Sequence, residues 1–116
     1  MRIYISHSSS FDYKMELYAP LMASDLWAAH EFILPHATSF DPIRRKEEIE
    51  ACDLVIAEIS YPSTGSGIEI GWAHAAGARV AALHKDDCKP SSSIKIVTSE
   101  IFAYDNFVAA LEKLLD

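Results

Sequence analysis

The sequence predicts an α/β domain in which a parallel five-stranded sheet lies between two layers of helices. Short β-branched and apolar runs alternate along the chain with segments of helical periodicity, the pattern of a parallel sheet with helical crossovers. One run, residues 53–60, is almost wholly apolar, as expected of a central strand buried on both faces. The chain has 116 residues, 50% of them hydrophobic, which suffices for one core, and we expect a single domain over residues 1–116.

Five segments have the composition of strands. In chain order they cover residues 2–6, 31–36, 53–60, 78–84 and 100–104. The first leads into a serine-rich loop, and the second ends at Pro35. Crossovers between parallel strands are right-handed, so the helices should cover both faces of the sheet. The expected arrangement is a three-layer Rossmann-like or flavodoxin-like domain.

The first helical segment begins near residue 11. Its apolar residues recur at helical spacing and are expected to face the core: Phe11, Met15, Tyr18, Met22 and Leu26. Pro20 interrupts this series, and a proline either kinks a helix or lies in the first turn of a new one.

Three more helices follow. Asp41 and Pro42 are expected to be the N-cap and first residue of the second, and Asp105 the N-cap of the last. Small residues in the third, residues 65–77, suit close packing against the sheet. The last helix should turn three residues to the core: Phe107, Leu111 and Leu114.

Composition excludes several classes of partner. A formal charge of -7 argues against binding to a nucleic-acid polymer, which depends on Lys and Arg. Two cysteines and five histidines without ligand spacing favour neither a disulfide framework nor a metal site. No apolar run approaches the roughly 20 residues of a membrane span. The chain starts with a strand-like segment and no signal peptide, so we expect a cytoplasmic protein without membrane contact.

Three polar loops should meet at one edge of the sheet. Ligands of open parallel sheets bind where the strands end, and residues 6–10, 60–67 and 85–93 follow three expected strands. All three loops are rich in Ser, Thr or Gly, which suits a pocket for a phosphate or carboxylate beside a helix N-terminus. The dinucleotide-binding and Walker glycine patterns are absent.

Glu69 is the candidate catalytic residue. It lies in the first turns of an otherwise apolar helix, after the glycine-rich stretch "PSTGSG". A helix N-terminus favours the ionised carboxylate, which suits a nucleophile. The alternative is that Glu69 only stabilises the helix dipole.

The stretch "ACDLVIAEISYPSTGSGIEIGWA", residues 51–73, resembles the core motif of the nucleoside 2-deoxyribosyltransferase family. It is most similar to the branch of (2'-deoxy)nucleoside 5'-monophosphate N-glycosidases. The resemblance implies hydrolysis of the N-glycosidic bond of a nucleotide, or transfer of its base, with Glu69 as the nucleophile that forms a glycosyl-enzyme intermediate. It also implies a small-molecule nucleotide or nucleoside as the partner, and no cofactor or metal.

The resemblance assigns binding roles as well. Ser63 and Gly65 match positions that hold the 5'-phosphate, with Gly67 beside them. Ser93 matches a serine that the neighbouring subunit of a homodimer contributes, and Tyr4 matches a position beside the substrate. Four of these residues also have a structural alternative. Ser63 could be a turn serine and Gly65 could supply a required backbone angle. Ser93 could cap a helix and Tyr4 could be a core tyrosine.

The chain departs from the family pattern at two places. Arg45 stands where the branch has an aspartate that assists the reaction, and Asp41 is the candidate replacement if it is not only an N-cap. The glycine-rich loop with an arginine after the first strand is replaced by "SHSSS", so Ser6, His7 and Ser8 are candidate substrate ligands.

Glu58, at the end of the central strand, has two readings. Either it hydrogen-bonds to the base or sugar, or it organises the loop through backbone N–H groups. Two other functions also stay open. One is a nucleotide-sensing module that kept the pocket without turnover. The other is a TIR-like NAD glycohydrolase, suggested by "IYISHSS" although the Trp-Cys-x-x-Glu pattern is absent.

Overall fold

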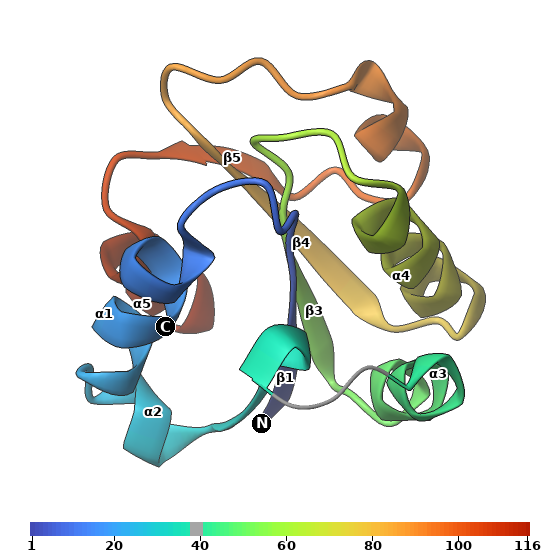
Figure 1. Cartoon of the computed structure of the whole chain (residues 1–116), viewed down its shortest axis with the longest axis horizontal. Coiled ribbons are helices and arrows are strands. Elements are labelled where there is room, and N and C mark those ends of the chain that lie inside the picture. Colours follow the sequence, from blue (N-terminus) through green and yellow to red (C-terminus); the bar gives the residue numbers. More distant parts are fainter. Residues whose placement is uncertain (38–40) are drawn as a thin grey trace.

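The computed structural model describes residues 1–37 and 41–116. Its centre is a five-stranded sheet of order β2-β1-β3-β4-β5 in which every pair of neighbours is parallel (Figure 1). The strands are β1 (Arg2–Ser6), β2 (Glu31–Ile33), β3 (Leu54–Glu58), β4 (Arg79–Lys85) and β5 (Ile101–Tyr104). The predicted fold class and the central position of the apolar strand are confirmed.

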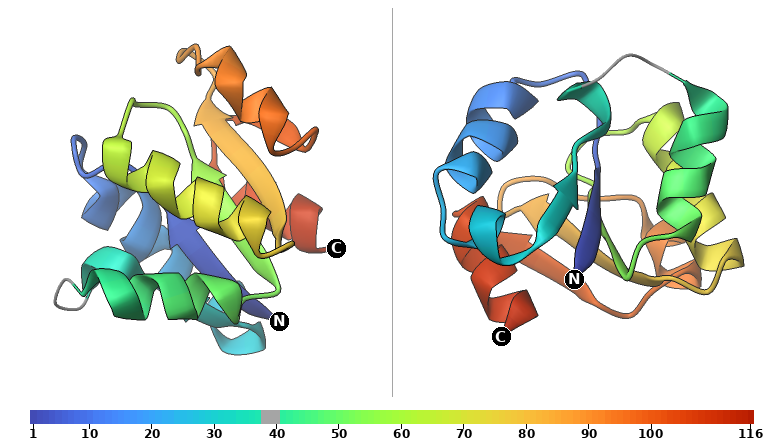
Figure 2. Two further views of the ribbon diagram at one scale, coloured as in Figure 1. Left: turned by 90° about the vertical axis from the view of Figure 1, so that its right-hand side faces the viewer. Right: turned by 90° about the horizontal axis from the view of Figure 1, so that it is seen from below.

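Helices cover both faces of the sheet (Figure 2). On one face lie η1 (Lys14–Tyr18), α1 (Ala19–Met22), α2 (Leu26–Ala29) and α5 (Phe107–Leu115). On the other lie α3 (Pro42–Glu50) and α4 (Thr64–Ala75), and two short 3₁₀ helices, η2 (Pro35–Ala37) and η3 (Ser92–Ile96), complete the chain. Among the helices of the described residues, none is long and apolar enough to cross a membrane.

The core has two halves, one on each face of the sheet. Successive residues of a strand point to opposite faces, so Ile3 and Ile5 pack against η1, α1 and α5, whereas Tyr4 packs toward α3 and α4. This alternation in β1 decides which side chains can meet a residue of α4.

The expected buried face of the first helix is confirmed in part: Tyr18 is buried, Phe11 and Leu26 pack at the edge of the core, and Met15 and Met22 do not face it. The segment is a π-helix, η1, followed by α1, which begins with Pro20 in its first turn as anticipated. The buried residues are Leu17, Tyr18 and Leu21, and of the residues expected inside, Met15 and Met22 are 67% and 46% exposed. The wider i→i+5 turn shifts the register, so a period of 3.6 residues does not continue through it.

Of the two helix caps predicted from the sequence, one is confirmed and the other is displaced by one residue. Asp41 caps α3 as expected, because its Oδ1 accepts hydrogen bonds from the backbone N of Ile43 (3.1 Å) and Arg44 (3.3 Å). The cap of α5 is Asn106, not Asp105: its side chain accepts a hydrogen bond from Ala109 N at 2.9 Å. The turn between β5 and α5 is therefore one residue longer than the sequence predicted.

The close packing predicted for the small residues of α4 is made by Ser66 and Ala73 and not by its glycines. Open space surrounds the position that a Cβ would take at Gly65, Gly67 and Gly71, and all three are exposed. Ser66, Ile70 and Ala73 face inward instead. Gly77 has a conformational role: its φ of +75° ends α4, with hydrogen bonds from Gly77 N to His74 O and from Ala78 N to Ala73 O.

Candidate active site

A cavity of about 520 Å³ lies beside the N-terminal half of α4. The loop after β1, η2, the start of α3 and α4 supply its walls. It is lined by His7, Ser9, Pro35, His36, Pro42, Arg45, Ser63, Gly65, Ser66, Ile68, Glu69 and Trp72.

Two hydroxyl groups from β1 hold the carboxylate of Glu69. Tyr4 OH donates to Oε2, and Ser6 Oγ donates to Oε1 at 2.9 Å. Tyr4 and Ser6 are two residues apart in a strand and therefore point to the same face, toward α4. Ser66 Oγ lies 2.7 Å from Ser6 Oγ and completes a chain of hydroxyls. The carboxylate is thus fixed in orientation at the wall of the cavity.

Burial dominates the electrostatics of Glu69. It raises the pKa of the carboxyl group above its usual value, while the hydrogen bonds from Tyr4 and Ser6 and the charge of Arg45 act in the opposite direction. The net shift is therefore opposite to the ionised form that the helix N-terminus was expected to favour, because burial is the largest contribution. Glu69 lies beyond the first turn of α4, where the field of the helix end has fallen off.

His7 is held in a neutral state under the cavity. It is 2% exposed, with Nδ1 2.8 Å from Ser8 O and Nε2 2.7 Å from Tyr18 OH. A carbonyl can only accept, so Nδ1 carries the proton and Nε2 accepts from Tyr18. Burial lowers the pKa of His7 to about 4, which agrees with a neutral ring.

Arg45 stands at the position where the family that the sequence resembles has an aspartate. Its side chain is buried, at 6% exposure, and its guanidinium donates to the backbone carbonyl of Pro35. It lines the cavity with Glu69 and favours the ionised form of that carboxylate. The site therefore contains a fixed cation in place of a second carboxylate.

The other predicted residues divide into those at the cavity and those away from it. Ser63 lines the cavity and caps α4 by accepting a hydrogen bond from Ser66 N at 3.2 Å, and Gly65 lies beside it. Ser8 is buried against Ser10, with their Oγ atoms 2.7 Å apart.

Two predicted acidic residues lie outside the cavity. Asp41 is occupied as the cap of α3. Glu58 is 1% exposed and accepts from Ser60 N (2.7 Å), Ser60 Oγ (2.9 Å) and Tyr104 OH. Glu58 therefore organises the loop after β3, and a ligand beside Glu69 would not touch it.

Ser93 and Gly67 line a different cavity, on the other side of the start of α4. This second cavity, of about 310 Å³, also contains Ser63, Ser66 and Lys89. The three polar loops expected to meet at the ends of the strands do so around α4, but they form two cavities rather than one.

Among the residues of the Glu69 cavity that the sequence did not assign to the site are Ser66, Trp72 and His36. Ser66 and Trp72 lie three residues before and after Glu69, so helical spacing would have placed them on neighbouring parts of α4. His36 carried no such signal, because η2 reaches the cavity only through the tertiary fold.

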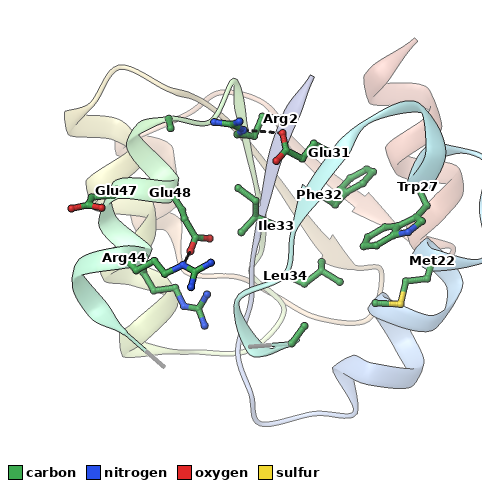
Figure 3. A pocket seen from close by; sticks show the side chains of 13 residues that line it. Arg2, Met22, Trp27, Glu31, Phe32, Ile33, Leu34, Arg44, Glu47 and Glu48 are labelled. Atoms are coloured by element: carbon green, nitrogen blue, oxygen red, sulfur yellow. Dashed lines mark hydrogen bonds and ion pairs between the residues drawn. The ribbon is translucent and has the colours of Figure 1, made fainter. Parts of the chain in front are cut away.

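A larger hollow, of about 660 Å³, lies along the open edge of β2 (Figure 3). Phe32 and Trp27 stack there with ring centroids 5.8 Å apart, and Arg2 pairs with Glu31 at 3.0 Å. Its lining mixes both charges with apolar groups, and Arg45 is the residue it shares with the Glu69 cavity. In the described part of the chain, no three His, Cys, Asp or Glu side chains are placed to hold a metal ion.

Comparisons with known proteins give structural likeness only. No family model and no curated protein matches the chain. Clostridium botulinum CMP N-glycosidase BcmB superposes with a TM-score of 0.69 over 100% of both chains at 22% identity. A 2-deoxyribosyltransferase from Bacillus psychrosaccharolyticus has a TM-score of 0.70 at 13% identity, over 95% of this chain and 90% of that one. A conserved protein from Enterococcus faecalis V583 has a TM-score of 0.62 at 20% identity, over 98% and 87%. The chain thus has the fold of these N-glycosidase and deoxyribosyltransferase structures.

Proposed function

We propose that this protein is an N-glycosidase of the nucleoside 2-deoxyribosyltransferase family that cleaves a nucleoside 5'-monophosphate. The observation that carries the proposal is the Glu69 carboxylate, oriented by Tyr4 and Ser6 at the wall of a cavity that also contains the start of α4. The shared fold and the motif of residues 51–73 support the same reaction.

Glu69 is the nucleophile in this proposal. An ionised oxygen of Glu69 bonds to C1' of the sugar while the C1'–N bond breaks and its electron pair leaves with the base. Water then attacks C1' and releases the carboxylate. A partly desolvated carboxylate held by two hydroxyls needs little reorganisation before this attack.

The 5'-phosphate is proposed to bind at the start of α4. N–H groups in the first turn of a helix have no acceptor within the helix, and they attract anions. Gly65 and Ser63 lie there and line the Glu69 cavity, and Arg45 adds a positive charge. These features support a monophosphate over an uncharged nucleoside.

Ser93 is proposed to act in a homodimer. Within its own chain it lines the second cavity and not that of Glu69, so a contact with the bound phosphate would come from another copy. The two helices that line this second cavity, α4 and η3, each carry an exposed apolar side chain, Ile68 (50%) and Ile96 (77%), which supports an interface there.

Hybrid dimers test the shared site. Ser93→Ala and Glu69→Ala chains are each expected to be poorly active on a monophosphate. Mixing them should restore activity, because one site of the hybrid joins an intact Glu69 to an intact Ser93. A monomeric mass, or no recovery on mixing, would argue against the shared site.

The hydrolase proposal is tested with a panel of nucleoside monophosphates, nucleosides and NAD. Release of free base from a monophosphate is expected, with loss of turnover in Glu69→Ala and Glu69→Gln. Glu112→Gln, at an exposed position of α5, is the matched control. No base release from any member of the panel would refute the proposal.

The same assay separates the alternative functions. An exchanged nucleotide after addition of a second base would indicate transfer, and nicotinamide release would indicate NAD cleavage. Binding by calorimetry without turnover, and with unchanged affinity in Glu69→Gln, would indicate a sensing module.

A further inference from the structure

His36 brings a second titratable ring into the Glu69 cavity. It belongs to η2, far from α4 in the sequence, yet both side chains line the same cavity. His36 is exposed, and no described residue forms a hydrogen bond with its ring. Both ring nitrogens are therefore available to a ligand.

The position of the ring is nevertheless fixed. Its centroid lies 4.8 Å from that of His7 and 5.2 Å from that of Tyr13, with interplanar angles of 46° in both cases. The backbone N of His36 donates to Tyr18 OH at 3.2 Å, the same hydroxyl that donates to His7. The buried His7 and Tyr18, with the half-buried Tyr13, thus support an exposed imidazole.

The other groups at the cavity cannot supply a proton. His7 uses both ring nitrogens, one as donor to Ser8 O and one as acceptor from Tyr18. The guanidinium of Arg45 does not deprotonate in proteins. Tyr4 donates its hydroxyl proton to Glu69, and burial together with that carboxylate raises the pKa of Tyr4. His36 is the remaining titratable group among the described lining residues.

We propose that His36 is the general acid that protonates the departing nucleobase. This inference rests on the hydrolase function proposed above, and it replaces a carboxylate acid by an imidazolium. As the C1'–N bond breaks, the imidazolium gives its proton to a nitrogen or oxygen of the base while Glu69 bonds to C1'. Neutral His36 then accepts a proton from the attacking water, and cleavage of the glycosyl ester returns Glu69 as a carboxylate.

The pH dependence of the reaction follows from the groups that face His36. These groups are His7, Tyr13, Tyr18, Arg45 and Glu69. The ring is exposed at the cavity but partly shielded from water by its neighbours, and this partial desolvation, followed by the charge of Arg45, lowers the pKa of His36 below its usual value of 6.5. Turnover needs ionised Glu69 and protonated His36, so kcat/KM should have an acidic optimum and fall as the pH rises above the pKa of His36.

The experiment compares His36→Asn with His74→Asn, an exposed histidine in the last turn of α4 that does not line the cavity. On the monophosphate that the panel identifies, His36→Asn should lower kcat by about 10²-fold or more, the usual contribution of a general acid. It should change KM much less and remove the alkaline limb of the pH profile. His74→Asn should behave as wild type.

Leaving-group variation distinguishes an acid from a structural residue. Bases that depart without protonation, such as 7-methylguanine or 5-fluorouracil in place of guanine or uracil, should be released almost as fast by His36→Asn as by wild type. Imidazole added to His36→Ala should restore part of the turnover.

Two results would overturn the role of His36. One is an equal loss for good and poor leaving groups, and the other is wild-type kcat and pH profile in His36→Asn. A wild-type chain that releases no base would overturn the hydrolase function, and this role with it. An active wild type together with wild-type activity in His36→Asn would overturn the role of His36 alone.

Discussion

Acid should destabilise this protein through one buried side chain, His7. The ring is 2% exposed and neutral, and its pKa falls from 6.5 to about 4 on folding because burial penalises the charged form. A group whose pKa is depressed in the folded state stabilises the fold above its unfolded pKa, and that stability is lost as the pH falls through the folded pKa. A difference of about 2.5 pKa units corresponds to about 3 kcal/mol in total, of which about 2 kcal/mol is lost between pH 7 and pH 5.

Urea denaturation at several pH values measures this loss. The free energy of unfolding of wild type and His7→Gln is compared at pH 7, 6 and 5. His7→Gln starts lower at pH 7, because it disturbs the hydrogen bonds with Ser8 and Tyr18. The gap between the two proteins should then narrow by about 2 kcal/mol at pH 5. A gap that stays constant over this range, or a directly measured His7 pKa near 6.5, would refute the reasoning.

Three further predictions concern α3, α4 and Glu69. Asp41→Ala should lower the free energy of unfolding by about 1 kcal/mol, because the helix cap is lost. Asp41→Asn should keep both the stability and the rate of base release. A loss of base release in Asp41→Asn would instead indicate a catalytic carboxylate. Gly77→Ala should destabilise the protein by about 1 kcal/mol because Gly77 has a positive φ. Gly71→Ala should stabilise it by about 0.5 kcal/mol, because no atom lies near the position of the new Cβ. Equal effects of the two substitutions on thermal unfolding would contradict this account. The raised pKa of Glu69 means that wild type loses stability relative to Glu69→Gln as the pH rises above about 4.5 and through the folded pKa, and a difference in unfolding free energy that does not change with pH would contradict it.

The strands were predictable because their signal is local. A run such as residues 53–60 has no polar face, so it fits only a buried position, and β3 occupies it. The segment around η1 was less predictable, because a single π-turn rotates every later side chain without altering composition. The glycines of α4 misled for a related reason: small residues permit close packing but do not require it, and here they face outward.

The acidic residues of the candidate site also differ in whether their roles can be predicted from nearby sequence. Asp41 has a local role that the Asp-Pro pattern already indicated. Glu58 ends the apolar strand β3, and Glu69 lies on the helix that follows it. Glu58 hydrogen-bonds to Ser60 and Tyr104, whereas Glu69 lines a cavity. Ser60, two residues after Glu58, offers a local signal for its structural role, whereas the partners of Glu69, Tyr4 and Ser6, are more than 60 residues away in the sequence.

The sequence by itself determined the parallel α/β architecture, the cap of α3 and the presence of Glu69 on a helix after a glycine-rich turn, since each depends on residues near one another in the chain. Only the tertiary structure decided that Tyr4 and Ser6 hold Glu69, that Arg45 is buried beside it, and that His36 shares its cavity. The physical reason is the order of the sheet: β1 lies between β2 and β3, so its inward-facing hydroxyls meet α4 on one face, and the chain leaving β2 passes over the same cavity.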